Sequence, residues 1–570
     1  MISKKWRTSE RKYNVITGRH IPILMSDGVT IDGDVFRPDD GGKFPALLCV
    51  HPYDNPLQSA PLMPHGFGVG NGILEAGDPN FFVRRGYAQV IANVRGSGRS
   101  GGYLDLFQPR ERRDTYEIIE WIAAQPWCDG NVGMFGVSYF AMAAQQVTSL
   151  KPPHLKAIFA PYAVTDFYRD SIYHGGILAH AFTQGIRGRS LSSPRFEPDT
   201  WYRKKYGDEK FKQAVASALQ DEDLCAVPYI LEQLRTGTGP LDNYLNYLDG
   251  EYYRERSVSY EGTEIPAYLG ACWGIYGLHL PGAFRSWEHW RGPKKMTIGP
   301  PVYLDRPLYQ YAYESIRWFD YWLKGMENDI LAGPPIKLFV VGTGDWKTAD
   351  EWPLPETKWT SFYLHANGLL SEHEFWPNEG HSSFENSFMN HGNLTFLSPP
   401  LVENTEVLGP IALNLYASTT DTEILWFVTL LDIDPHGNET LLTRGWLRGS
   451  HRRIDPERSK PWQPFHLHTR REPLTPNEIY EFNIEIMPYG ILFQPGHRIG
   501  VRIKCTDDEK PNNFLEAVGT GHIWRQAGSR VSIHHNADYP SHLLLPITKG
   551  NVLETFISGG KLPQEPYRRF

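Results

Sequence analysis

The chain has 570 residues, of which 41% are hydrophobic, 21% are charged and 13% are aromatic, and its net charge is −8. These values exclude a disordered, collagen-like or coiled-coil protein. The negative charge argues against nucleic acid or an anionic membrane as the partner, because both require a basic surface. A chain of this length is longer than one hydrophobic core usually supports, so we expect roughly two to four domains. The large aromatic content predicts an aromatic-lined pocket.

The cysteine pattern and the apolar segments indicate where the protein resides. The five cysteines lie far apart and include no CxxC pair, which indicates reduced, structural thiols. The first residues lack the apolar run of a signal peptide, and no stretch approaches the roughly 18 apolar residues of a membrane span. We therefore expect a cytoplasmic protein with no membrane partner.

Residues 1–166 alternate strand-like and helix-like segments, which is the pattern of a parallel α/β sheet. The continuous apolar run at 44–50 predicts a strand that is buried on both faces. Further strands are predicted over 87–94 and 131–136, and helices over 114–125 and 141–147.

The rest of the chain changes character twice. Residues 167–260 are rich in Tyr, Arg, Asp and Leu at helical spacing, which predicts an inserted helical cap. Residues 261–334 return to strands and a helix, so we assign them to the second part of the core. Residues 335–570 contain short strands separated by turn residues, which predicts a β sandwich or jelly roll.

The turn Gly136-Val137-Ser138 lies between a predicted strand and an Ala-rich helix. Such a sharp turn can expose a serine Oγ and direct the next backbone N–H toward a developing oxyanion. Many strand–turn–helix junctions use Gly and Ser only to turn, so the turn by itself leaves both interpretations open.

The segment Trp127–Tyr139 resembles the nucleophile region of the cocaine esterase and X-Pro dipeptidyl-peptidase family of α/β-hydrolases. Further resemblances to this family lie at 51–54 and 93–102 and, in the last third of the chain, at 431–437, 445–448 and 495–498. The resemblance covers nearly the whole chain. It implies an α/β-hydrolase core with an inserted helical cap and a C-terminal β jelly-roll domain.

The resemblance also implies roles for individual residues. Ser138 corresponds to the nucleophile, and the Tyr53 hydroxyl and the Tyr139 backbone N–H correspond to the oxyanion hole. His51, beside Tyr53 at a strand end, is a candidate substrate contact, although an ordinary strand-end residue is the alternative.

The family's acid and base positions carry other residue types in this chain. The aspartate position falls near Ile275 and the histidine position falls on Tyr303, so the usual Ser–His–Asp triad is absent. His279, on the same loop as the missing aspartate, is the predicted base or a contact to a substrate carbonyl. The alternative for His279 is a loop histidine that is hydrogen-bonded to backbone.

Other residues near the predicted site are candidates for substrate binding. They are Trp273, Tyr276 and Tyr303 beside the missing acid and base, and His174 on the predicted cap. No histidine spacing predicts a metal site, and the glycine run at 96–102 lacks a Walker pattern, so we expect no cofactor.

Three hypotheses follow for the function. The first is a serine hydrolase or acyltransferase that acts on an ester, amide or other acyl bond of a small organic substrate through Ser138 and His279. The second is non-hydrolytic carbonyl chemistry, such as C–C bond cleavage or cyclisation, because carbonyl polarisation needs no activated serine. The third is a catalytically inactive binding protein. The sequence leaves open whether the chain forms a homo-oligomer.

Overall fold

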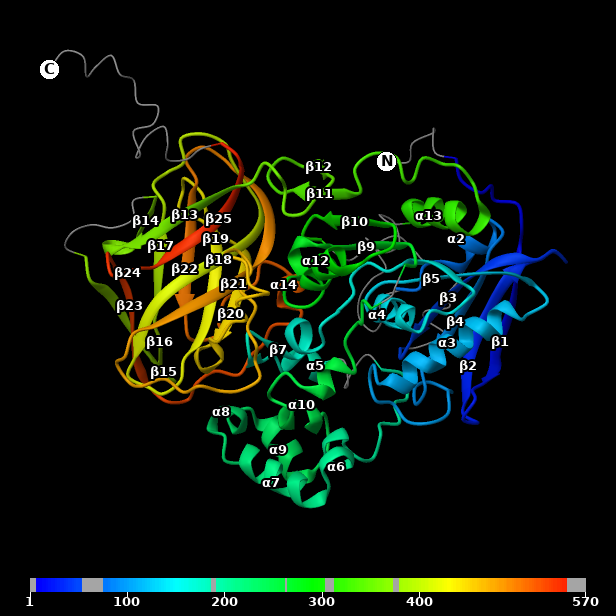
Figure 1. The fold of residues 1–570 in the computed structure, drawn as a ribbon, viewed down its shortest axis with the longest axis horizontal. Coiled ribbons are helices and arrows are strands. Elements are labelled where there is room, and N and C mark those ends of the chain that lie inside the picture. Colours follow the sequence, from blue (N-terminus) through cyan, green and yellow to red (C-terminus); the bar gives the residue numbers. More distant parts are fainter. Residues whose placement is uncertain are drawn as a thin grey trace, which may run out of the picture.

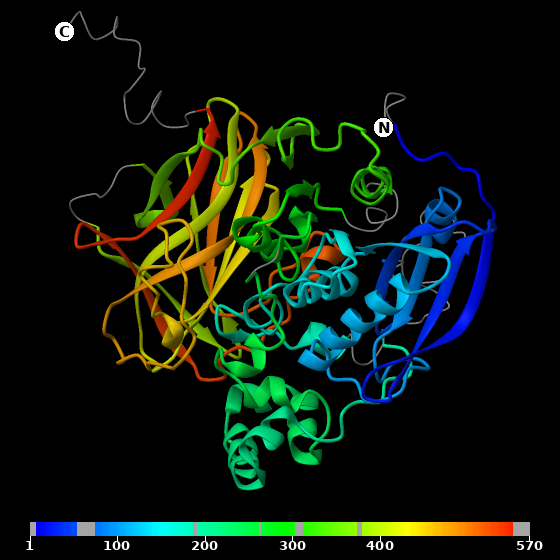
Figure 2. The same cartoon turned by 45° about the vertical axis from the view of Figure 1, so that its right-hand side comes forward.

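The computed structural model describes residues 7–53, 75–185, 191–261, 264–302, 312–372 and 379–550. A sheet-centred core and a β domain lie side by side, and a group of helices projects beneath them (Figures 1 and 2). Among the helices of these residues, none is long and apolar enough to cross a lipid bilayer.

The core is built on a ten-stranded sheet with the order β1-β2-β4-β3-β5-β6-β9-β10-β11-β12. The strands from β4 to β11 in this order run parallel to their neighbours, and β1, β2 and β12 are antiparallel at the edges. Every residue of β3 is buried, as its continuous apolar sequence predicts. The bounds are β1 (Val15–Leu24), β2 (Thr30–Pro38), β3 (Phe44–His51), β4 (Ala88–Asn93), β5 (Cys128–Phe135), β6 (Leu155–Phe159), β9 (Ala267–Cys272), β10 (Lys294–Gly299), β11 (Ile336–Val340) and β12 (Asp345–Ala349).

Helices pack on this sheet, and some of them differ from the sequence prediction. They are α2 (Pro79–Val83), α3 (Pro109–Ala123), α4 (Tyr139–Val147), α12 (Leu280–His289) and α13 (Ala312–Lys324). Helix α3 begins earlier than we expected, because a proline is well tolerated in a first helical turn. Helix α12 was not predicted, although Pro281 in its first turn is a typical start signal.

The core sheet extends past residue 334, where we expected the C-terminal domain to begin. β11 pairs in parallel with β10, with Ile336 opposite Met296, and β12 then pairs antiparallel with β11. The predicted domain boundary stays a prediction, and the pairing shows that an apolar alternation identifies a strand but not the sheet to which that strand belongs.

Short helices fill most of the region predicted as a cap. They are α5 (Ala181–Gly185), α6 (Trp201–Tyr206), α7 (Asp208–Ala218), α8 (Glu222–Cys225), α9 (Pro228–Thr236), α10 (Leu241–Leu245) and α11 (Glu251–Arg254). They follow a π-helical turn at Tyr168–Ile172 and the small hairpin of β7 (Tyr173–His174) and β8 (Ile177–Leu178). The side chains of Ile230 and Leu234 on α9 are buried, so this group of helices has an apolar interior.

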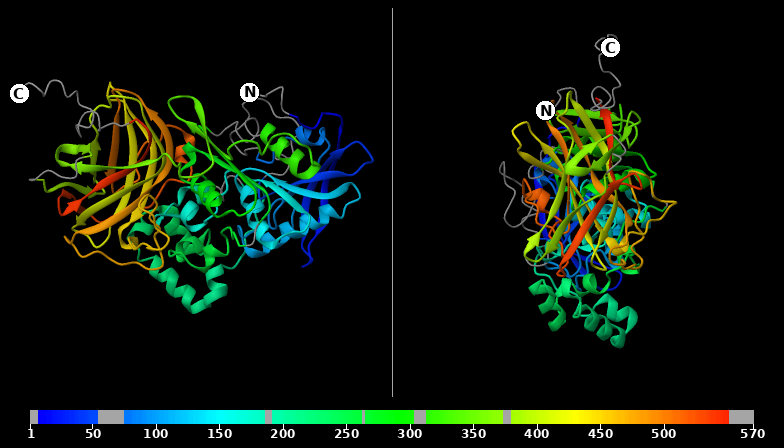
Figure 3. Two further views of the ribbon diagram at one scale, coloured as in Figure 1. Left: turned by 45° about the horizontal axis from the view of Figure 1, so that its top comes forward. Right: turned by 90° about the vertical axis from the view of Figure 1, so that its left-hand side faces the viewer.

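The C-terminal domain is all β apart from short helical turns, and its strands curve around a common interior (Figure 3). Its thirteen-stranded sheet has the order β16-β15-β23-β18-β21-β20-β19-β22-β17-β14-β13-β25, and β24 pairs with β23. Buried side chains such as Trp426 and Ile484 fill the interior. The all-β character is confirmed, whereas the jelly-roll topology stays a prediction. The bounds are β13 (Lys358–His365), β14 (Leu369–Ser371), β15 (His381–Ser387), β16 (Asn390–His391), β17 (Asn393–Leu397), β18 (Thr405–Thr419), β19 (Leu425–Ile433), β20 (Glu439–Arg448), β21 (Tyr480–Phe493), β22 (Arg498–Lys504), α14 (Phe514–Ala517), β23 (Ser529–Asn536), β24 (Tyr539–Pro540) and β25 (His542–Lys549).

Candidate active site

Ser138 occupies a strained turn between β5 and α4. Its backbone adopts φ 60° and ψ −120°, which a residue with a Cβ rarely adopts. Two residues earlier, a Cβ on Gly136 would lie 2.2 Å from the Cβ of Phe140, so only glycine fits where the chain doubles back. The turn places the half-buried Ser138 side chain at the carboxyl end of the parallel strands.

Two hydrogen-bond donors lie beside Ser138. Tyr53 follows β3, and its hydroxyl is hydrogen-bonded to the Ser138 side chain. Burial, together with the negative charge of Glu75, raises the pKa of Tyr53 well above its usual value, so the hydroxyl stays protonated and can donate. Tyr139 is the first residue of α4, and its backbone N–H therefore has no partner within the helix.

His51 lies at the end of β3 beside Tyr53, and its predicted role as a substrate contact stays a prediction. Its Nδ1 accepts a hydrogen bond from the Tyr53 backbone N–H at 3.1 Å. Its ring stacks on Phe140 with the ring centroids 4.8 Å apart. At the end of a buried strand His51 thus fixes the direction in which Tyr53 leaves the sheet.

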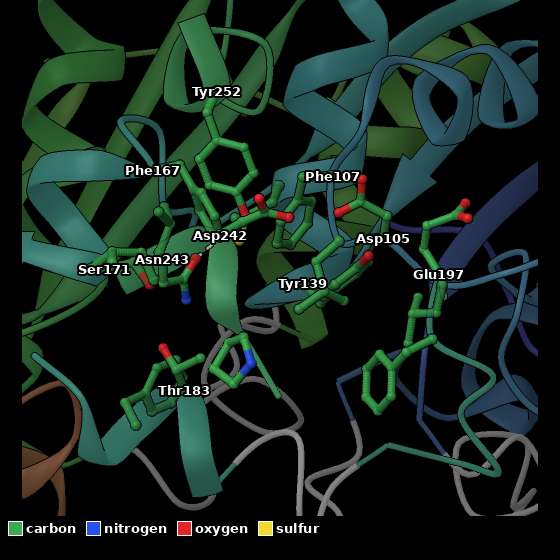
Figure 4. Close-up of a pocket in the computed structure, with 18 of the residues that line it drawn as sticks. Asp105, Phe107, Tyr139, Phe167, Ser171, Thr183, Glu197, Asp242, Asn243 and Tyr252 are labelled. Carbon is green, nitrogen blue, oxygen red and sulfur yellow. Dashed lines mark hydrogen bonds between the residues drawn. The ribbon is translucent and has the colours of Figure 1, made fainter. Parts of the chain in front are cut away.

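A cavity of about 120 Å³ opens over Ser138, enough for on the order of ten water molecules. Tyr53, Ser138, Tyr139 and His279 all line it. Aromatic side chains from the core and from the cap form much of the remaining wall, and Figure 4 shows Phe107, Phe167 and Tyr252 among them. The structure therefore brings the predicted catalytic residues together in one aromatic-lined cavity.

His279 immediately precedes α12 and is 3% exposed. Burial lowers the pKa of its imidazole to about 3, so the ring is neutral at neutral pH and able to accept a proton. Its Nδ1 has no hydrogen-bond partner among the described residues. His279 is thus a buried neutral imidazole in the cavity wall, and its role as the base stays a prediction.

Three predicted substrate contacts do not line this cavity. The indole Nε1 of Trp273 donates to the Phe339 carbonyl at 2.7 Å, and Tyr276 and His174 line a second cavity. That cavity also borders residues of the C-terminal domain. Trp273 begins the 3-10 turn that follows β9, and Tyr276 caps the end of this turn. Tyr303 lies outside the described residues.

The structure adds wall residues that the sequence did not reveal. The Tyr139 hydroxyl donates to Glu111 Oε1 at 2.7 Å, and the Tyr139 ring stacks on Phe107 with the centroids 4.2 Å apart. Burial raises the pKa of Glu111 to about 8. Asn243 and Tyr252 reach the wall from the cap helices, where no motif marks them. In the sequence, the position of Glu111 was indicated only by its helical spacing, which places it on the buried face of α3.

The carboxylates of the wall already have partners. Asp105 pairs with Arg256 at 2.7 Å, and Asp242 accepts backbone N–H bonds from Trp201 and Tyr202 at 2.8 Å each. Figure 4 shows Asp105 and Glu197 on the same side of the cavity. Asp105 and Asp242 therefore both have hydrogen-bond partners, and the wall combines aromatic side chains with other apolar and polar ones. Within the described ranges, no cluster of three or more His, Cys, Asp or Glu side chains could hold a metal ion.

The strand order and the strained serine turn define an α/β-hydrolase. Residues 27–302 match the family model described as X-Pro dipeptidyl-peptidase (S15 family). Residues 328–544 match the model described as the X-Pro dipeptidyl-peptidase C-terminal non-catalytic domain. The chain belongs to this family, which includes cocaine esterase.

Individual relatives are similar to this chain over most of its length. Cocaine esterase of Rhodococcus sp. is 26% identical over 94% of this chain and 99% of its own length. A Mycobacterium bovis protein described as a candidate serine esterase is 28% identical over 85% of this chain and 90% of its own length. The crystal structure of a CocE/NonD family hydrolase from Staphylococcus aureus superposes with a TM-score of 0.77 at 26% identity, covering 94% of both chains. These relatives support a serine hydrolase.

Replacing Gly136 with alanine should disrupt the serine turn. The added Cβ would meet Phe140 and lie 3.2 Å from the Glu75 carbonyl, so we expect the free energy of unfolding to fall by about 1–3 kcal/mol. Urea unfolding measures this loss. The matched control is Gly41→Ala, where nothing lies within 4 Å of the new Cβ, and an equal effect of both variants would contradict the prediction.

The buried His279 should make the protein sensitive to acid. The pKa of its imidazole rises from about 3 in the folded chain to its ordinary value near 6.5 on unfolding, so the unfolded chain binds more protons below pH 6.5. Stability should therefore fall as the pH decreases, by about 2 kcal/mol between pH 7 and pH 5 from this group. His279→Gln should remove that contribution. Urea midpoints of both proteins at the two pH values test this, and identical pH dependence would rule it out.

Proposed function

We propose that the protein hydrolyses an ester, amide or other acyl bond of a small organic substrate, with Ser138 as the nucleophile. The observation that carries the proposal is the strained Ser138, hydrogen-bonded to Tyr53 in the same cavity as the neutral His279. Family membership supports it, because the relatives are named as esterases and peptidases.

In the first half-reaction, Ser138 Oγ attacks the carbonyl carbon of the substrate while its proton passes to His279. The oxyanion that forms accepts hydrogen bonds from the Tyr53 hydroxyl and the Tyr139 N–H, and the positive end of the α4 dipole lies at the same place. The bond to the leaving group then breaks, and the leaving group takes the proton from His279. An acyl group remains on Ser138.

In the second half-reaction, water attacks the acyl carbon and gives its proton to His279. The Ser138–acyl bond breaks, the serine oxygen takes the proton back, and the carboxylic acid leaves. If another nucleophile replaces water, the same steps give acyl transfer. The aromatic wall supports a substrate with an apolar body, since such surfaces bury organic groups well.

A second candidate function is non-hydrolytic carbonyl chemistry in the same cavity. It is favoured by Ile275 at the acid position and by the Nδ1 of His279, which has no partner among the described residues. A histidine without an orienting acid is a weaker activator of serine, whereas carbonyl polarisation by Tyr53 and Tyr139 does not depend on it.

A fluorophosphonate probe distinguishes these two functions. We expect the probe to label wild-type protein on one serine, because activated serine nucleophiles attack phosphorus. Ser138→Ala should abolish the label and the hydrolysis of p-nitrophenyl acetate. Mass spectrometry locates the modified residue. An unlabelled but folded wild-type protein would refute covalent catalysis and leave the second candidate.

The role of His279 should appear in the pH profile of kcat/KM for p-nitrophenyl acetate. Because the pKa of its imidazole is about 3, the free enzyme keeps a neutral base down to low pH. We expect no decrease between pH 7 and pH 5, where a histidine of ordinary pKa would lose roughly 30-fold.

The variant His279→Ala should reduce kcat/KM by about 100-fold or more. His289→Ala, at the exposed far end of α12, is the matched control. Unchanged turnover in His279→Ala would assign the base to another group.

A further inference from the structure

One loop of the β domain packs directly against two segments of the cavity wall. Gly519 lies so close to Gly277 that a Cβ on Gly519 would be 1.8 Å from the Gly277 carbonyl oxygen. Backbone hydrogen bonds join the same loop to the segment after β8, from His180 N–H to the Gly521 carbonyl at 3.0 Å and from Ile523 N–H to the Leu178 carbonyl at 3.1 Å.

A chain of buried side chains follows this contact. Arg444 on β20 donates to Asp507 Oδ1 at 2.7 Å, and the other oxygen of Asp507 contacts His522 Nδ1 at 2.7 Å. His522 Nε2 meets His174 Nδ1 at 2.8 Å, and His174 Nε2 meets the Asp170 carbonyl oxygen at 3.2 Å. The chain therefore runs from the β domain through two imidazoles into the core.

Counting protons fixes the roles of the two histidines. His174 must donate from Nε2, because the Asp170 carbonyl can only accept, and a neutral imidazole has a single N–H. Its Nδ1 therefore accepts, and His522 must donate from Nε2 as well as from Nδ1 to Asp507. Burial lowers the pKa of His174 to about 3, which agrees with a neutral ring at that position.

The surroundings support this arrangement. The side chains of His522, Asp507 and Arg444 are 0%, 4% and 4% exposed, so the charges are compensated by one another and not by water. Trp446 stacks on His174 with the ring centroids 4.8 Å apart and lies 5.4 Å from the ring of His522. Burial and then the neighbouring His522 also lower the pKa of His180.

The chain ends at the wall that carries the candidate base. The Trp446 ring packs on His174 and also on Tyr276, three residues before His279, with ring centroids 4.8 and 6.2 Å away. Toward the N-terminus, Ile172 and Ser171 lie two and three residues before His174, and both line the cavity. A shift of His174 would therefore move both parts of the wall relative to Ser138.

We infer that His522, held by Asp507, is a positioning residue that places His174 and, through it, the His279 loop against Ser138. The inference rests on the proposed function of this cavity. It makes the β domain a part of the catalytic apparatus, although none of its residues lines the cavity among the residues described.

The test compares His522→Ala, His174→Ala and the double variant in the full-length chain. Steady-state kinetics with p-nitrophenyl acetate, the rate of fluorophosphonate labelling and Tm are measured for each. We expect kcat and the labelling rate to fall together by about 10- to 100-fold, because small displacements of catalytic groups cost this much. KM should change by less than about threefold. The double variant should be no worse than either single variant, because both break the same chain.

Conservative variants separate positioning from folding. His522→Gln places an amide near the position of the ring Nε2 and should recover part of kcat, whereas His522→Asn mimics only the contact to Asp507 and should not. The matched control is His497→Ala, which breaks another His–Asp pair of the β domain, with Nδ1 2.7 Å from Asp432 Oδ1. We expect it to leave kcat unchanged.

The outcomes distinguish the two proposals. A lower Tm with wild-type kcat and labelling rate in the His522 variants would show a merely structural role and overturn the inference. Additive losses in the double variant would also overturn it. Absence of labelling in the wild-type protein would refute the serine mechanism, and the kcat comparison would still report on His522.

Discussion

The backbone strain at Ser138 is the constraint on which the site depends. A residue with a Cβ keeps φ 60° only when its surroundings allow no alternative, and here the buried strand β5, the helix α4 and the close approach at Gly136 provide that enforcement. The same turn exposes Oγ and leaves the first N–H groups of α4 free. Nucleophile and oxyanion hole are therefore consequences of one local conformation.

The remaining machinery is divided among parts of the chain that lie far apart in sequence. The sheet supplies Ser138 and Tyr53, and the beginning of α12 supplies His279. His279 is a buried neutral imidazole, and its orientation depends on the backbone of its loop. That loop is in close contact with the β domain, because Gly519 packs directly against Gly277.

The sequence predicted what depends on local patterns and missed what depends on long-range packing. The buried strands and the serine turn were predictable, because apolar runs and Gly-x-Ser spacing act within a few residues. His279, predicted from its loop, lines the same cavity as Ser138. Trp273 and Tyr276 are not among the residues that line this cavity, and β11 pairs with the core sheet, because a strand's sequence does not show which strand it pairs with. His174 contacts His522, nearly 350 residues away, and no local pattern reveals such a pair.

The contact between Gly277 and Gly519 has a consequence for biosynthesis. The serine turn is complete once the first parallel strands have been made, but the residues that press on the far wall of the cavity lie almost 400 positions later. At roughly 5–20 residues per second, the ribosome takes tens of seconds to cover that interval. A nascent chain therefore contains the serine turn for most of its synthesis before the residues that pack on the Gly277 loop have been made. The cavity acquires all of its supporting contacts only near the end of translation.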